Sequence, residues 1–263
     1  MGRQEASEAA VEGATGGDAG PAAHALEGRP PVEVLAWAAE VFASRVAFGT
    51  GFGAEGCVLI DIIGRHKLPI DVFTLDTGLL FSETYALWRR LEDRYGITIR
   101  AVRPRQSVEE QAAGHGPRLW ERDPDTCCAL RKQAPLRAAL AGLDAWISAI
   151  RRDQTRERSH SRTVERDLRF GLVKINPLLE WTTDEVWAYL RRHDVPYNPL
   201  HDRGYPSIGC FPCTGPVRPG EDPRAGRWRG RGKTECGLHA THPSRALAAL
   251  RTSNEGGGDA LAG

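Results

Sequence analysis

The sequence contains no apolar run long enough to cross a membrane. Glu5 and Glu8 occur early and no long apolar stretch follows them, which argues against a secretory signal. The chain also lacks an excess of either charge, because 35 Lys and Arg nearly balance 34 Asp and Glu for a formal net charge of +1. We therefore expect a cytoplasmic protein that binds neither membrane nor nucleic acid, in which any anion site is built locally.

Disulfide bonds are not expected either, because thiols of a cytosolic chain normally stay reduced. The chain has six cysteines, and we interpret them as metal ligands or reactive thiols rather than as structural disulfides. Cys57 lies on the apolar face of a predicted helix and behaves as a small hydrophobe. The other five form three compact groups, which are Cys127 with Cys128, Cys210 with Cys213, and Cys236.

Between two weakly patterned ends, strand-like apolar runs alternate with amphipathic helical segments. This rhythm predicts an α/β fold with a parallel twisted sheet covered by helices on both faces, in which ligands bind at the carboxyl ends of the strands. Residues 1–28 are expected to form a disordered leader and 243–263 a flexible tail. The predicted strands are 45–48, 70–75, 97–102, 145–150 and 172–175, and the predicted helices are 31–43, 55–66, 82–95 and 182–192.

Three loops follow predicted strands and are candidates for binding a nucleotide. The first, with Gly49, Thr50, Gly51 and Glu55, is either a backbone cradle for an anion or a tight turn, and it lacks the lysine of the Walker pattern. The second contains Leu75, Asp76, Thr77 and Gly78 and suits either ribose and base contacts or a simple turn. The third contains Arg151, Arg152, Asp153 and Gln154, with Arg158 close behind, and suits an anion site or a solvated loop.

The two cysteine pairs supply four thiols, which is enough to hold a metal centre. The adjacent Cys127 and Cys128 point in different directions and would strain a single tetrahedral ion, whereas a cubane offers four separated corners. We therefore favour an iron–sulfur cluster over zinc and over unliganded thiols. Cys236 has Lys233 before it and His239 after it, which suits a thiolate nucleophile, the alternative being a zinc-ligand pair of Cys236 and His239.

Taken in order, these motifs resemble the assimilatory adenylyl-sulfate reductases, relatives of the phosphoadenylyl-sulfate reductases. The resemblance runs from about Val46 to His239. It implies a fold like the adenine nucleotide α-hydrolases and ATP pyrophosphatases. It also implies reduction of adenosine 5′-phosphosulfate (APS) to sulfite and AMP, with electrons from thioredoxin. The motifs that carry it are Leu75–Gly78, Cys127–Cys128 with Leu130–Lys132, Arg151–Gln154, Gly209–Thr214 and Glu235–His239.

The resemblance also implies roles for individual residues. Cys236 and His239 would be catalytic, with a cysteine S-sulfonate intermediate on Cys236. A [4Fe–4S] cluster would be held by Cys127, Cys128, Cys210 and Cys213. Substrate contacts would come from the three loops (Gly49, Thr50, Gly51, Glu55; Leu75, Asp76, Thr77, Gly78; Arg151, Arg152, Asp153, Gln154, Arg158) and from Lys132, Arg224 and Arg227.

On this basis residues 29–215 would form the nucleotide-binding domain with its cluster, and 216–242 a mobile catalytic segment. The sequence leaves the oligomeric state open, with a homo-oligomer among the outcomes. Three other functions stay open. They are reduction of the 3′-phosphorylated substrate, adenylation by an ATP pyrophosphatase-type enzyme, and a non-catalytic iron–sulfur or zinc redox sensor.

Overall fold

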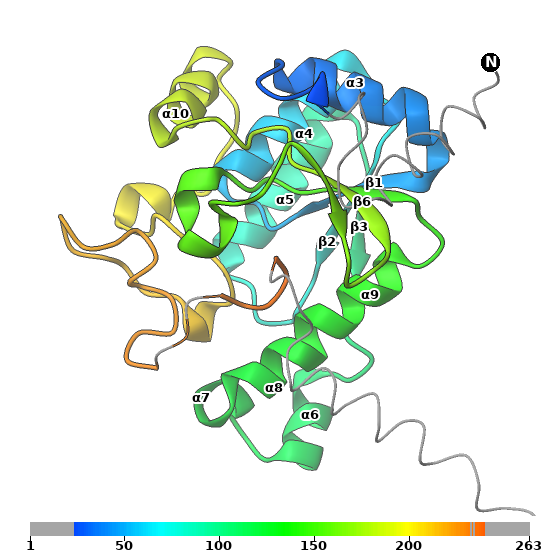
Figure 1. Cartoon of the computed structure of the whole chain (residues 1–263). Coiled ribbons are helices and arrows are strands. Elements are labelled where there is room, and N and C mark those ends of the chain that lie inside the picture. The colour runs from blue at the N-terminus through cyan, green and yellow to red at the C-terminus, as the bar shows by residue number, and fades with distance from the viewer. Residues whose placement is uncertain (1–23, 232, 234, 240–263) are drawn as a thin grey trace, which may run out of the picture.

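A six-stranded sheet forms the centre of the computed structural model, which describes residues 24–231, 233 and 235–239 (Figure 1). The strand order is β3-β2-β1-β4-β6-β5. Neighbouring strands are parallel except for β5 and β6, which pair antiparallel at one edge. The strands are β1 (Val46–Thr50), β2 (Asp71–Leu75), β3 (Ile99–Val102), β4 (Ala145–Ile147), β5 (Val164–Asp167) and β6 (Leu172–Ile175).

The prediction of a largely parallel α/β sheet is confirmed, and β5 is the strand that the sequence analysis missed. Val164 is the one apolar residue in β5, so no alternating pattern marks it. β4 ends at Ile147, three residues earlier than predicted. The Ser148 amide still donates to the Ile175 carbonyl at 2.9 Å, and its hydroxyl donates to the side-chain oxygen of Asn176 at 2.6 Å.

Four long helices cover one face of the sheet and enclose the larger core (Figure 1). They match the predicted helices because each carries a continuous apolar stripe. Thr182 and Glu185 form the predicted capping box at the start of the last one. The helices are α3 (Pro31–Phe42), α4 (Ala54–His66), α5 (Ser82–Tyr95) and α10 (Thr183–Arg192).

A smaller core lies on the other face, where Leu136 and Leu140 of α9 (Ala134–Leu140) pack against Phe73 and Trp146. Short elements lead into α9 from below the sheet in Figure 1. These are α6 (Val108–His115), α7 (Leu119–Arg122), α8 (Pro124–Cys128) and the π-helical turn η2 (Ala129–Gln133). Short 3₁₀ turns occur at η1 (Ala43–Arg45), η3 (Arg152–Gln154), η4 (Arg156–Arg158), η5 (His201–Arg203) and η6 (Phe211–Cys213).

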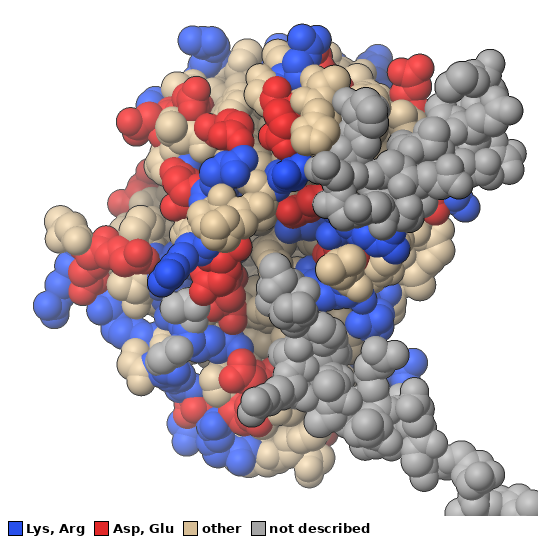
Figure 2. Space-filling model, viewed as in Figure 1, with Lys and Arg blue, Asp and Glu red and all other residues tan. Residues whose placement is uncertain are grey.

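The end of the predicted leader packs on this fold. Leu26 is buried, and the Glu27 carboxylate accepts hydrogen bonds from the amide of Thr163 at 3.1 Å and its hydroxyl at 2.7 Å. The rest of the leader and the predicted tail lie outside the described residues. None of the described helices has the length and apolar character needed to cross a membrane. Acidic and basic side chains are interspersed over the face in Figure 2, in keeping with the balanced composition.

Candidate active site

A cavity of about 700 Å³ lies over the carboxyl ends of β1, β2 and β4, where the sheet architecture predicts a ligand. Its size suits a nucleotide-sized molecule. Fifteen of the eighteen predicted catalytic and substrate-binding residues line it: Gly49, Thr50, Gly51, Glu55, Leu75, Thr77, Lys132, Arg151, Asp153, Gln154, Arg158, Arg224, Arg227, Cys236 and His239. Asp76, Gly78 and Arg152 do not line it, and Arg152 instead pairs with Glu180.

The glycine loop owes its composition to close packing as well as to the cavity. A side chain at Gly49 would lie 2.9 Å from the Phe73 ring, and one at Gly56 would lie 2.7 Å from the Thr50 hydroxyl. The Thr50 hydroxyl also accepts a hydrogen bond from the amide of Phe52 at 3.1 Å. The loop therefore lies tightly against β2 while its backbone faces the cavity before α4 begins.

Arg151 lines the cavity, but its guanidinium holds the surrounding loop together. Glu55 accepts from Arg151 Nε at 2.9 Å and from Gln154 Nε2 at 2.9 Å, which ties the arginine loop to the start of α4. The other N–H groups of the Arg151 guanidinium donate to Asp153 (2.8 Å), the Trp181 carbonyl (3.2 Å) and the Thr183 hydroxyl (2.9 Å). Because these donors are occupied, Arg151 acts as a scaffold for Gln154 and Arg158.

Asp76 also serves the shape of its loop. Its carboxylate accepts from the Tyr85 hydroxyl at 2.6 Å, Arg103 Nε at 3.0 Å and the Gly78 amide at 3.2 Å. The turn that results places the Thr77 hydroxyl 3.3 Å from the sulfur of Cys210. The second loop thus connects the cavity to one of the cysteine pairs.

Besides Arg151, four cationic side chains of the described residues line the cavity, namely Lys132, Arg158, Arg224 and Arg227. Nε of Arg158 and Nε of Arg227 are buried and find no hydrogen-bond acceptor among the described residues. Burial would lower the pKa of Lys132, but the nearby Cys210, Cys236 and Cys128 raise it by more than burial lowers it. The pKa of Lys132 therefore lies above the usual lysine value, and its ammonium stays charged. Buried donors without a partner point to a ligand that supplies anionic oxygens.

The segment that carries Cys236 is docked in the cavity through its backbone. Gln133 Nε2 donates to the Cys236 carbonyl at 3.2 Å. Arg169 donates to the carbonyls of Gly237 at 2.8 Å and Leu238 at 2.7 Å, while its own position is fixed by Asp167 at 2.8 Å. The sequence analysis missed Gln133 and Arg169. Gln133 directly follows Lys132 in η2, and π-helical turns are frequent at functional sites.

His239 completes the docked segment. Its ring stacks on Trp146, with centroids 5.8 Å apart and an angle of 4° between the planes. Burial lowers the pKa of His239 well below its usual range, and the surrounding cations lower it further. The imidazole is therefore neutral when the segment is docked. The cations are Arg158, Lys174, Arg169 and Arg224.

Acid should therefore loosen this segment. The docked state disfavours the protonated ring, so docking is fully stable above the usual histidine pKa of about 6.5 and weakens as the pH falls below it. We expect hydrogen exchange of residues 235–239, corrected for intrinsic rates, to be several-fold faster near pH 5.5 than near pH 8. His239→Phe keeps a ring on Trp146 but cannot take up the proton, so its exchange should not respond. Equal corrected rates for the wild type at both pH values would contradict this.

The four cysteines of the two pairs line one small cavity beside the active-site pocket, together with Lys132. Cys127 and Cys128 form the end of α8, whose start is capped by the Asp123 carboxylate. The amide of Phe211 bonds to the Leu79 carbonyl at 2.8 Å and so anchors the second pair next to the Leu75–Gly78 loop. Within the described part of the chain, no group of three or more cysteine, histidine or acidic side chains is arranged to hold a single metal ion.

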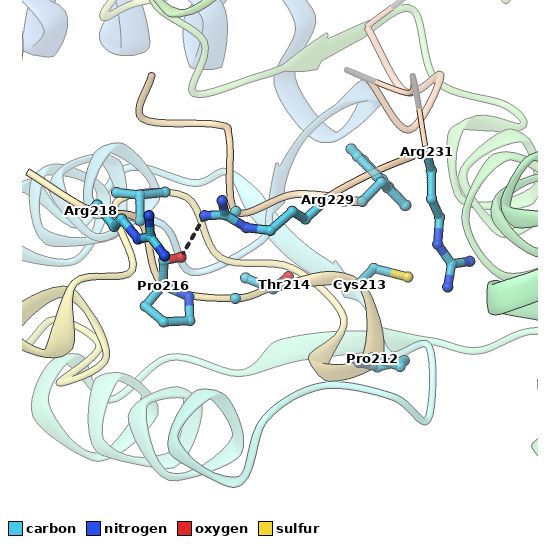
Figure 3. Close-up of a pocket in the computed structure, with 11 residues that line it drawn as sticks. Pro212, Cys213, Thr214, Pro216, Arg218, Arg229 and Arg231 are labelled. Carbon is cyan, nitrogen blue, oxygen red and sulfur yellow. Dashed lines mark hydrogen bonds between the residues drawn. The ribbon is translucent and has the colours of Figure 1, made fainter. Parts of the chain in front are cut away.

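A second pocket, of about 560 Å³, lies on the outside of the second cysteine pair (Figure 3). Figure 3 shows the Cys213 sulfur on the side of Arg231, and Cys213 is the one candidate ligand that is only half-buried. Arg229 donates to the Pro216 carbonyl at 3.0 Å and to Glu221 at 2.9 Å, and Arg231 donates to the Trp120 carbonyl. These arginines brace the loop around the cysteine pair.

Known proteins with a similar sequence and fold include two reductases. An adenosine 5′-phosphosulfate reductase from Halalkalibacterium halodurans is 49% identical over 216 residues, which is 82% of this chain and 94% of that protein. A phosphoadenylyl-sulfate reductase from Candida auris, solved as a phosphate complex, has a TM-score of 0.64 at 35% identity and covers 72% of this chain and 91% of its own.

A more distant structure, the FMN adenylyltransferase of Candida glabrata, has a TM-score of 0.50 at 13% identity, over 97% of this chain and 90% of its own. It shares the fold alone, which agrees with the predicted fold class. Residues 45–216 match the phosphoadenosine phosphosulfate reductase domain. By this match and by the identity to its relatives, the chain belongs to the phosphoadenosine phosphosulfate reductase family.

Proposed function

We propose that the chain reduces adenosine 5′-phosphosulfate to sulfite and AMP in sulfate assimilation. The observation that carries the proposal is the half-buried Cys236 thiol in a nucleotide-sized cavity, next to Lys132, Arg158 and Arg227. The name of the Halalkalibacterium halodurans relative supports the choice of substrate. A cavity of this kind supplies both a nucleophile and the cations that an anionic substrate requires.

In this reaction the Cys236 thiolate attacks the sulfur of the bound sulfonate. A sulfur–sulfur bond forms to Cys236, the bond from sulfur to the phosphate oxygen breaks, and AMP leaves with that electron pair. Nucleophile and target are both anionic, so attack depends on Lys132, Arg158, Arg224 and Arg227 to offset the repulsion. A thiolate of reduced thioredoxin then attacks the sulfur of Cys236, the bond to the sulfonate breaks and sulfite leaves with that electron pair. The second thiol of thioredoxin resolves the mixed disulfide, which returns the Cys236 thiol and leaves thioredoxin as a disulfide.

We also propose that Cys127, Cys128, Cys210 and Cys213 hold a [4Fe–4S] cluster. All four thiols line one cavity, and burial raises the pKa of Cys127 to about 11 and of Cys128 to about 12. Four thiols gathered in one cavity suit a group that binds them as thiolates and displaces their protons. When bound, the cluster would tune the electrostatic field at Lys132, while the two electrons come from the thioredoxin.

Release of the S-sulfonate to thioredoxin requires the docked segment to open. We therefore propose that residues 216–242 move between the closed position and one in which Cys236 is accessible, on a domain formed by 29–215. The contacts at Cys236, Gly237 and Leu238 are hydrogen bonds to backbone carbonyls, which can break and re-form without loss of a covalent link. We place the reaction in the cytoplasm, where thioredoxin is kept reduced.

The direct test is anaerobic purification followed by a visible spectrum and a sulfite assay with each nucleotide. We expect a brown protein that releases sulfite from APS, with a kcat/KM for the 3′-phosphorylated substrate at least about tenfold lower. Preference for the 3′-phosphorylated substrate would assign the other reductase activity. Release of pyrophosphate from ATP would favour an adenylating enzyme. A brown protein that releases neither sulfite from either nucleotide nor pyrophosphate from ATP would favour a redox sensor.

A further inference from the structure

The carboxylate of Glu235 lies between two of the cavity arginines. One oxygen is 2.8 Å from Arg158 NH2 and the other is 3.2 Å from Arg224 NH2. The three side chains are withdrawn from solvent, with exposed fractions of 12% for Glu235, 9% for Arg158 and 17% for Arg224. A buried ion pair of this kind stabilises the protein only while the carboxylate and the guanidiniums stay paired, because removal of one partner leaves an uncompensated buried charge.

The same two guanidiniums belong to the set that faces the cavity and would bind the substrate's anion. Glu235 also precedes Cys236 directly, so the carboxylate is delivered to the arginines by the segment that delivers the nucleophile. A carboxylate and a sulfonate both use paired oxygens to accept from an arginine fork. The substrate and Glu235 therefore compete for one pair of cations.

We propose that Glu235 is an internal placeholder anion at the Arg158–Arg224 pair, which the sulfonate of the substrate displaces. This inference rests on the substrate class of the proposed function. Between turnovers the placeholder gives the two buried arginines an anionic partner, which reduces the desolvation penalty that they would otherwise carry. Its charge weakens the binding of any oxyanion in the pair until it has moved away.

Displacement of Glu235 does not undock the nucleophile. Gln133 and Arg169 hold the carbonyls of Cys236, Gly237 and Leu238, and neither contact involves Arg158 or Arg224. The Glu235 side chain can thus swing out while Cys236 keeps its place. Substrate binding is in this way coupled to the conformation of a single side chain next to the nucleophile.

Calorimetric titration with sodium sulfate tests the proposal on the full-length, cluster-containing protein at low ionic strength. Removal of the charge in Glu235→Gln should tighten sulfate binding about tenfold, a coupling of ordinary size between two ligands of one site. Glu235→Asp keeps the charge, but its side chain is too short to reach both arginines. The sulfate affinity of Glu235→Asp should therefore fall between that of the wild type and that of Glu235→Gln. Glu83→Gln is the matched control, because Glu83 pairs with the exposed Arg203 outside the cavity, and it should bind like the wild type.

Equal or weaker sulfate binding by Glu235→Gln, or by Glu235→Asp if the first variant does not fold, would overturn the placeholder role. In steady-state assays the KM for APS should fall in Glu235→Gln while kcat does not rise, whereas a purely structural role would raise KM. Calorimetry does not depend on turnover. A wild type that releases no sulfite from APS would therefore refute the proposed function and leave the sulfate result to decide the placeholder.

Discussion

Replacement of Cys236 by serine should lower sulfite release from APS by about three orders of magnitude or more. A serine hydroxyl remains protonated at neutral pH, and neighbouring cations that favour a thiolate do not ionise it. Intact-protein mass spectrometry after incubation with APS, without thioredoxin, should show a sulfonate adduct on the wild type and none on Cys236→Ser. Because the arginines and the glycine loop are unchanged, the variant should still bind AMP.

The matched control is Cys57→Ala. Cys57 is fully buried in α4 and does not line the active-site cavity, and burial raises the pKa of its thiol far above neutrality. This variant should form the adduct and release sulfite like the wild type. Sulfite release from Cys236→Ser at the wild-type rate would remove the assigned nucleophile, and an adduct on Cys57 would assign it elsewhere.

Elements with a strong internal period could be predicted from the sequence, and elements defined by a distant partner could not. α4 and α5 carry continuous apolar stripes, and the parallel strands are apolar runs, so their positions follow from local patterns. β5 is held instead by its pairing with β6, including the 2.8 Å contact between Lys174 and Glu165. Residues 164–167 contain no local sequence pattern that predicts this pairing.

The site shows the same division. Lys132 and Arg158 could be proposed because they stand in recognisable motifs next to strand ends or cysteines, and both line the cavity. Asp76 was expected to bind substrate but is turned to Tyr85 and Arg103, which are distant enough in sequence to hide the contact. Arg169 was missed because its partners in the docked segment are backbone carbonyls, which every residue has and no motif records.

Gly209 offers a way to displace Arg227 without changing any charged residue. A Cβ at Gly209 would lie 2.7 Å from Cζ of Arg227, whose guanidinium stacks on Trp228 at 4.5 Å and donates to the Ser207 hydroxyl at 3.2 Å. The atoms that the new methyl group would meet are the far end of the Arg227 side chain, so Gly209→Ala should push the guanidinium out of its place. We expect kcat/KM for APS to fall by about two to three orders of magnitude, the size of losing a preorganised cation at the developing charge.

The two half-reactions separate this effect from general damage. Formation of the S-sulfonate from APS should slow in Gly209→Ala, whereas thioredoxin should reduce an S-sulfonate already formed at close to the wild-type rate, since Arg227 is assigned to the first step. Gly215→Ala is the matched control beside the same cysteine pair, because its nearest neighbour would lie at an ordinary 3.9 Å. The visible spectrum of both variants reports whether the cluster is retained. Wild-type S-sulfonate formation in Gly209→Ala would mean that Arg227 does not hold the reacting anion.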